Sequence, residues 1–215
     1  NAMLSSINNR TKLIFIANPN NPTGTILKDE ELFEFLSKIP SSVIVVLDQA
    51  YFEYLDADDN ALDWLSKFNN LIITRTFSKA YGLAGLRVGY SLSSVEIAEY
   101  INRLRQPFNV SHIAQNAATA ALADQDFLAS SIKSNYEGLA QLSNGFNRLG
   151  LRYIPSSANF ISLEVDDPNF VYEKLLTKGF IVRPIEIEGY LRVTVGTRQE
   201  NEDFLEALKL VLDLK

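Results

Sequence analysis

Lys79 lies in a polar, glycine-containing segment whose residue types suit covalent chemistry on a carbonyl compound. The strand-like run 71–76 leads into Ser78, Lys79 and Gly82, so a strand end delivers the amine into a turn. A lysine in a partly dry pocket loses its charge readily and becomes a nucleophile that can form an imine. Arg87 follows eight residues later, and its planar guanidinium suits a phosphate. The alternative is a solvent-exposed lysine in a loop, with an unrelated arginine nearby.

Three apolar, β-branched runs precede the polar groups of the first half, at residues 13–17, 43–47 and 71–76. Unbroken runs of this kind are typical of strands in a parallel sheet buried on both faces. Between the first two runs, an amphipathic pattern over residues 29–39 begins with three acidic residues and predicts a helix. Strand, helix and strand at this spacing predict a right-handed parallel βαβ unit, and therefore an α/β domain.

Each of these strands is followed by a polar residue that could face a ligand. Asn21 follows the first run, Asp48 the second and Lys79 the third. Open parallel sheets bind ligands beyond the carboxyl ends of their strands, so we expect the three side chains to share one crevice. Alternatively, Asp48 is a helix N-cap and residues 18–24 are only a turn rich in proline and glycine.

Pyridoxal 5'-phosphate would give each of these residue types a role. Lys79 would hold its aldehyde as an imine, and Asp48 would keep the pyridine nitrogen protonated so that the ring acts as an electron sink. Tyr51 and Asn21 could donate hydrogen bonds to the phenolic oxygen of the ring, although Tyr51 could also be a core residue. The phosphate could be bound by three further residues: Thr76, Ser78 and Arg87.

The pattern changes after Gly150, where short strands and helices alternate. Strands are predicted near 151–154, 158–165, 180–183 and 191–195, with helices near 168–178 and from about 200. This indicates a small α+β unit with a mostly antiparallel sheet. We therefore expect residues 1–135 to form part of a large cofactor-binding domain. Residues 136–215 would form a small C-terminal domain that includes the connecting helix.

Bulk composition excludes several other classes of function. The net charge of −6 over 215 residues argues against a nucleic-acid partner, and no apolar run approaches the ~20 residues of a membrane span. Cysteine is absent, which fits a reducing, cytoplasmic location. The single histidine, His112, falls in an alanine-rich helical stretch and disfavours a His-rich metal site or a Ser-His-Asp triad.

Several segments resemble fold-type I aminotransferases of class I and II, namely residues 20–24 (NNPTG), 48–51 (DQAY) and 76–90 (TFSKAYGLAGLRVGY). Others are similar to the histidinol-phosphate aminotransferase subgroup: residues 107–111, 157–160 and 191–196. The resemblance covers essentially the whole chain, and it is most specific around the lysine.

This resemblance implies a cofactor, a reaction and a partner. Lys79 would be the Schiff-base residue and would move a proton between the substrate Cα and cofactor C4′. Arg192 would bind the substrate carboxylate or phosphate, and Arg183 is a weaker candidate for binding the same anion. The alternative is that Arg192 is only a surface residue on an edge strand. The implied reaction transfers the amino group of histidinol phosphate to 2-oxoglutarate in histidine biosynthesis, in a homodimer.

The chain departs from the family pattern at its beginning. The family's N-terminal phosphate loop, its ring-stacking aromatic residue and a tyrosine lent across the dimer have no counterpart here, and the connection from Arg183 to Arg192 is short. We therefore expect an active parent transaminase and an inactive 215-residue fragment. Residues 1–3 could be native or an expression scar.

Other functions fit the same sequence. The alternatives are an aromatic aminotransferase, a decarboxylase similar to threonine-phosphate decarboxylase, and a non-catalytic binding module. The presence of both Lys79 and Asp48 disfavours the non-catalytic module.

Overall fold

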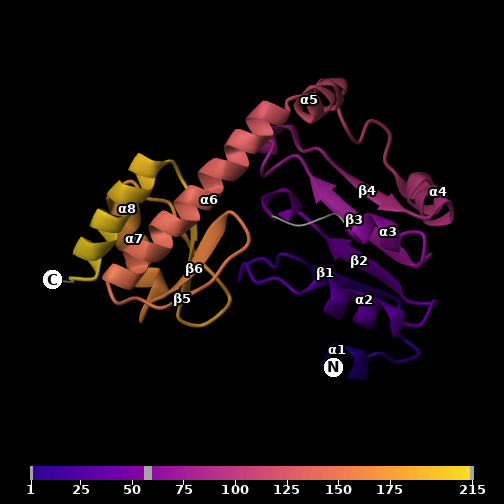
Figure 1. Cartoon of the computed structure of the whole chain (residues 1–215), viewed down its shortest axis with the longest axis horizontal. Helices are drawn as coiled ribbons and strands as arrows, with labels where there is room; N and C mark the ends of the chain where they lie inside the picture. Colours follow the sequence, from indigo (N-terminus) through magenta and orange to yellow (C-terminus); the bar gives the residue numbers. More distant parts are fainter. Residues whose placement is uncertain (1, 56–59, 214–215) are drawn as a thin grey trace. The chain divides into compact units, whose positions relative to one another are not determined.

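The computed structural model describes residues 2–55 and 60–213, which group into two compact units (Figure 1). Unit 1 runs to Pro19 and continues over Ile26–Gln125, and unit 2 contains Asn20–Thr25 and the chain from Asp126 onward. A short turn from early in the sequence therefore belongs with the C-terminal unit. The predicted domain boundary between residues 135 and 136 stays a prediction. No helix in the described part of the chain is both long and apolar enough to span a membrane.

Unit 1 is built on a four-stranded sheet of order β1-β2-β3-β4. Its strands are β1 (Leu13–Ala17), β2 (Ile44–Asp48), β3 (Leu71–Thr76) and β4 (Gly89–Ser93). The first three strands are parallel, and β4 pairs antiparallel with β3. The predicted α/β class with a mostly parallel sheet is thus confirmed, and the parallel strands place their carboxyl ends at one edge.

The helices of unit 1 connect and cover these strands. They are α1 (Ala2–Ser5), α2 (Asp29–Ser37), α3 (Asn60–Trp64), α4 (Val95–Leu104) and α5 (His112–Ala123), with short 3-10 turns η1 (Phe52–Tyr54) and η2 (Ala84–Leu86). Leu32 and Leu36 of α2 and Trp64 of α3 pack in one cluster with the buried residues of the strands. The predicted helix over residues 29–39 is therefore confirmed as α2, and its apolar stripe faces the sheet.

The sequence predicts that these strands are buried on both faces of the sheet, and for β1 this prediction is wrong. Burial alternates along this strand: Ile14 and Ile16 are buried, whereas Leu13 is 51% and Phe15 is 70% exposed. The side chains of a strand point alternately to its two faces, so α2 can cover only one of them. In the part of the chain that the structure describes, Leu13 and Phe15 are therefore left more than half exposed.

Unit 2 combines an antiparallel sheet of order β5-β6-β8-β7 with three helices. The strands are β5 (Tyr153–Ile154), β6 (Phe160–Glu164), β7 (Arg183–Pro184) and β8 (Tyr190–Thr194); the helices are α6 (Gln125–Arg148), α7 (Pro168–Thr177) and α8 (Arg198–Val211). Leu163 and Leu191 on one face of the sheet join Phe146, Leu175 and Leu208 of the helices in a fully buried core. The predicted antiparallel α+β unit is confirmed.

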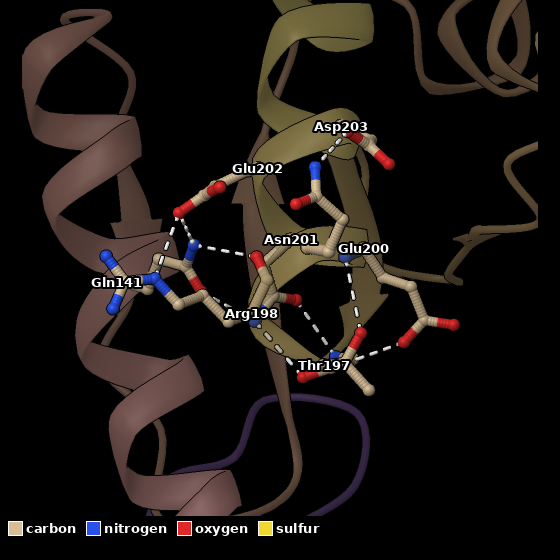
Figure 2. A network of polar contacts seen from close by, with 9 residues as sticks. Gln141, Thr197, Arg198, Glu200, Asn201, Glu202 and Asp203 are labelled. Carbon is tan, nitrogen blue, oxygen red and sulfur yellow. Dashed lines mark hydrogen bonds and ion pairs between the residues drawn. The ribbon is translucent and has the colours of Figure 1, made fainter.

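A polar network ties the start of α8 to α6 (Figure 2). The side chain of Asn201 is 2% exposed; its amide nitrogen donates to Gln141 Oε1 at 3.1 Å and to the carbonyl oxygen of Gly196 at 3.2 Å. The backbone nitrogen of Gly196 donates in return to Asn201 Oδ1 at 2.9 Å. Asn201 thereby satisfies both backbone groups of Gly196, in the short segment between β8 and α8.

Candidate active site

Asp48 is the last residue of β2, at the carboxyl edge of the parallel strands. The strand registers place Asp48 opposite Ala17 of β1 and Thr74 of β3. The Asp48 carboxylate is exposed, and its Oδ1 accepts a hydrogen bond from the backbone nitrogen of Ala50 at 3.0 Å. This local bond holds the side chain at the edge of the sheet, where a ligand of a parallel sheet would lie.

Lys79 follows the neighbouring strand and lies near an aromatic ring. Its Nζ is 5.4 Å from the centroid of the Tyr51 ring, and Tyr51 is only 4% exposed. Gly82 adopts φ +70 and donates its backbone N–H to the Lys79 carbonyl oxygen at 2.9 Å, so the chain turns sharply after the lysine. Tyr51 is therefore a core residue and a direct neighbour of the amine at once. A cation over a ring face is favourable.

Thr76, Ser78 and Arg87 lie together beside the turn that carries Lys79. The backbone nitrogen of Ser78 donates to Thr76 Oγ1 at 3.1 Å, and Arg87 Nη1 approaches Ser78 Oγ at 3.5 Å and the Ala84 carbonyl oxygen at 2.8 Å. Arg87 has φ 53 and ψ 50, a left-handed conformation that is uncommon for a residue with a side chain. Such strain persists where the surroundings enforce it, often at ligand sites. Two hydroxyls and a guanidinium form a donor set suited to a phosphate.

Two further polar residues, neither of them predicted from the sequence, support this edge. Gln49 is 7% exposed, and its Oε1 accepts from both Nε (3.1 Å) and Nη2 (2.8 Å) of Arg75, whose guanidinium stacks 3.9 Å from the Phe52 ring centroid. Asn18 bonds both backbone groups of Leu27, at 2.7 and 3.2 Å. The sequence offered one signal for them, which is their position: Gln49 directly follows β2, and Asn18 directly follows β1.

Tyr81 is a buried phenol beside the same turn. It is 9% exposed, and its ring packs 5.0 Å from that of Phe77. Burial raises the pKa of Tyr81 above its ordinary value, and the nearby carboxylate of Glu53 raises it further. The protonated, neutral phenol is thus the form that the folded protein favours.

Asn21 and Arg192 meet in unit 2. Arg192 Nη1 donates to Asn21 Oδ1 at 2.6 Å, and the Arg192 guanidinium lies 5.1 Å from the centroid of the Phe160 ring. The structure therefore groups Asn21 with Arg192, while Asp48 and Lys79 belong to unit 1. One N–H of the guanidinium is occupied by the amide oxygen, which defines the orientation of the planar group.

Arg183 lies directly opposite Arg192 in the β7–β8 ladder. Like charges at opposed positions on neighbouring strands are destabilising unless an anion offsets them. Both arginines line a pocket of about 510 Å³, together with residues of α7 and of the strand ends: Tyr172, Ile181, Val182, Pro184 and Thr194. The pair of guanidinium groups at this pocket is suited to a carboxylate or phosphate.

The sequence is similar to that of known enzymes. It is 52% identical over 216 residues to a histidinol-phosphate aminotransferase of Methylobacillus flagellatus, covering 98% of this chain and 58% of the relative. It is 51% identical over 217 residues to histidinol-phosphate aminotransferase 2 of Pseudomonas aeruginosa, covering 98% and 59%. The chain thus spans somewhat more than half the length of the curated relatives it matches.

Solved structures share the fold. A histidinol-phosphate aminotransferase of Sinorhizobium meliloti, in complex with pyridoxal-5'-phosphate, is 32% identical with a TM-score of 0.85, over 94% of this chain and 57% of that one. An L-threonine-O-3-phosphate decarboxylase of Porphyromonas gingivalis is 24% identical with a TM-score of 0.86, over 97% of this chain and 67% of that one, a likeness of fold alone. A family model, aminotransferase class I and II, matches residues 1–208. The chain belongs to the class I and II aminotransferase family.

Proposed function

We propose that the protein is a pyridoxal 5'-phosphate-dependent transaminase that moves the amino group of histidinol phosphate to 2-oxoglutarate, in histidine biosynthesis. The observation that carries this proposal is the group at the end of β3. There the Lys79 amine lies 5.4 Å from the centroid of a buried tyrosine ring, the hydroxyls of Thr76 and Ser78 come just before it, and the strained Arg87 approaches Ser78. Relatives about half identical to this chain, named histidinol-phosphate aminotransferases, support the choice of substrate.

The residues of unit 1 fit the cofactor group by group. The hydroxyls of Thr76 and Ser78 and the guanidinium of Arg87 match a phosphate in charge and donor number. The exposed carboxylate of Asp48 can keep a proton on a pyridine nitrogen, and Lys79 offers the amine that an aldehyde requires. When bound, pyridoxal 5'-phosphate supplies an electron sink for the carbanion formed at the substrate Cα.

Lys79 has two further tasks in the proposed reaction. Its Nζ would take the proton from the substrate Cα as the neutral amine, and the ammonium so formed would deliver the proton to C4′ of the cofactor. The Tyr51 ring, which is 4% exposed and whose centroid is 5.4 Å from Nζ, excludes water from one side of the amine.

Unit 2 would bind the anionic end of the substrate. Arg192 is held by Asn21 at 2.6 Å with its remaining N–H groups available for two oxygens, and Arg183 lies opposite on the neighbouring strand. Two guanidinium groups can bind the phosphate of histidinol phosphate or a carboxylate of 2-oxoglutarate. The same positive charge disfavours substrates whose far end is uncharged.

Reductive trapping tests the assignment of Lys79. The protein is incubated with pyridoxal 5'-phosphate, reduced with borohydride and analysed by peptide mass spectrometry. We expect a phosphopyridoxyl group on Lys79 at cofactor concentrations that leave the exposed Lys133 unmodified. The matched variant Lys79→Arg keeps the positive charge but cannot form the imine, and it should lose the modification. Equal labelling of Lys133 and Lys79 would overturn the assignment.

A substrate panel tests the reaction itself. Protein expressed from its gene is supplied with 2-oxoglutarate and with histidinol phosphate, phenylalanine or threonine phosphate, and glutamate formation is measured. We expect histidinol phosphate to be preferred. A preference for phenylalanine, or release of carbon dioxide from threonine phosphate, would contradict the proposal. That the 215 residues alone lack turnover stays a prediction, which the same assay checks.

The proposal includes a homodimer in the cytoplasm. In support, the apolar residues of α4 and of the loop that follows it are exposed in unit 1: Tyr100, Ile101, Leu104 and Phe108. An exposed apolar patch of this kind marks an interaction surface, and we assign it to a second copy of the chain. Sedimentation equilibrium checks this: Leu104→Glu should shift the protein toward monomer, and an unchanged mass would contradict it.

A further inference from the structure

Ser162, Arg192 and Arg183 form one row across the sheet of unit 2. The registers place Arg192 of β8 opposite Ser162 of β6 on one side and opposite Arg183 of β7 on the other. Side chains at directly opposed positions point to the same face of a sheet. The opposite face carries Leu163 and Leu191, which lie in the core with the helices. The serine hydroxyl therefore belongs to the face that carries both arginines.

Ser162 anchors the turn Asn20–Thr25 to this face. It is 0% exposed, and its Oγ donates a 2.5 Å hydrogen bond to the carbonyl oxygen of Pro22, a residue 140 positions earlier. The residue before Pro22 is Asn21, which accepts the hydrogen bond from Arg192. One buried hydroxyl thus holds the peptide group next to the residue that orients the guanidinium.

A second anchor holds the far end of the same turn. The backbone nitrogen of Ser157 donates to the Gly24 carbonyl oxygen at 2.8 Å. Gly24 has φ +75, and a Cβ there would lie 2.1 Å from Ser156 Oγ and 3.0 Å from Ser156 Cα. Only glycine permits this approach. With Pro22 and Gly24 both held, the position of Asn21 is determined from its C-terminal side.

We propose that Ser162 is a positioning residue for the anion-binding guanidinium of Arg192, and that it acts through Asn21. This inference rests on the proposed function, because it takes Arg192 to be the group that binds the substrate anion. Asn21 Oδ1 occupies one N–H and leaves the others as a preoriented fork for two oxygens. When the Ser162 hydroxyl is removed, the turn loses its central anchor. Anion binding must then also order the arginine, so affinity falls.

Phosphate binding by the 215-residue chain tests this inference. Inorganic phosphate is titrated into ¹⁵N-labelled protein, and the Arg192 Nε–H and Asn21 side-chain amide resonances are followed. Ser162→Ala, and Ser162→Cys, which nearly preserves the volume, should each weaken the phosphate Kd about tenfold, as expected for one hydrogen bond. Ser162→Thr keeps the hydroxyl and should bind like wild type. Ser134→Ala, an exposed serine on α6, is the control that should change nothing.

A double-mutant cycle separates positioning from general destabilisation. Asn21→Ala should weaken phosphate binding by itself, and adding Ser162→Ala should weaken it no further, because the serine acts through the asparagine. Backbone amide shifts of Leu163 and Leu191 report that each variant is folded. Wild-type affinity in both Ser162→Ala and Ser162→Cys, or additive losses in the cycle, would overturn this inference alone. Absence of Arg192-dependent phosphate binding in the wild type would overturn the anion role of Arg192 and this inference together.

Discussion

At the residue scale, the candidate site depends on side chains whose surroundings alter their chemistry. Lys79 lies against a buried ring, Arg87 is held in a left-handed conformation, and Arg192 is oriented by an amide oxygen. The left-handed conformation of Arg87 costs free energy, and holding the Lys79 and Arg192 side chains in place costs conformational freedom. Such costs are typical of positions retained for binding or catalysis rather than for stability.

Tyr81 predicts a specific dependence of stability on pH. Its pKa is raised in the folded state, mainly by burial, above the ordinary value of 10.0. Above pH 10 the unfolded chain releases this proton first, so the folded state binds more protons and the free energy of unfolding decreases as pH rises. Well below pH 10, Tyr81 is protonated in both states and adds no pH dependence to the free energy of unfolding.

Urea unfolding of wild type and Tyr81→Phe between pH 8 and 11 measures this effect. The variant should lose stability less steeply above pH 10 than the wild type does. The difference between wild type and Tyr81→Phe at pH 8 provides the baseline, because the Tyr81 phenol is protonated there in both the folded and the unfolded state. Parallel curves above pH 10 would contradict the assigned direction.

At the element scale, small residues on α6 allow α8 and Val195, the residue after β8, to pack closely against it. A Cβ on Gly138 would lie 2.3 Å from Val195 Cγ1 and 3.0 Å from Asn201 Nδ2, and one on Gly145 would lie 2.4 Å from Leu205 Cδ1. The contacts of 2.3 and 2.4 Å are closer than packed side chains tolerate. The network around Asn201 lies at the same junction (Figure 2).

The substitution Gly138→Ala should have two opposing effects on stability, a gain from helix propensity and a loss from overpacking. Alanine in a helix interior gains about 1 kcal/mol over glycine. Overpacking against a stiff β-branched side chain costs typically 1–3 kcal/mol, so we expect a net loss of stability. Ala140→Gly on the exposed side of α6 measures the propensity effect alone. If Gly138→Ala raised the urea midpoint, the close contact with Val195 would not be present in solution.

At the scale of the whole molecule, each unit has its own apolar core. One cluster joins the helices and sheet of unit 2, and the other joins α2 and α3 to the parallel strands of unit 1. Hydrophobic stabilisation is proportional to the apolar surface that contacts remove from water. A cavity in one cluster should therefore act mainly on its own unit.

Hydrogen exchange can check this separation. Leu175 is fully buried in unit 2, and Leu175→Ala should cost about 2–5 kcal/mol and reduce amide protection in β6. Protection of Ile73 in β3 should remain close to wild type. Leu47→Ala is the reciprocal variant in unit 1 and should show the opposite pattern. Equal losses in both units from either variant would indicate a single cooperative core.

Much of the architecture followed from local sequence pattern. The runs before Asp48 and Lys79 predicted two of the parallel strands. Ser111 at the start of α5, whose Oγ accepts from the backbone nitrogen of Ala114 at 3.1 Å, is a local signal of the same kind. Gly150, at φ +69, lies just past the end of α6, as a C′ glycine should. These signals work because strand periodicity, caps and glycine conformations depend on a few neighbouring residues.

The sequence by itself determined the strands that carry Asp48 and Lys79, the antiparallel second sheet and the family of the protein. Only the tertiary structure showed that the turn holding Asn21 belongs with unit 2, that Ser162 bonds Pro22 and that Arg192 bonds Asn21. These contacts join residues 140 and 171 positions apart. Local periodicity carries no information about such pairs, because strand register and packing across the sheet decide which of them meet.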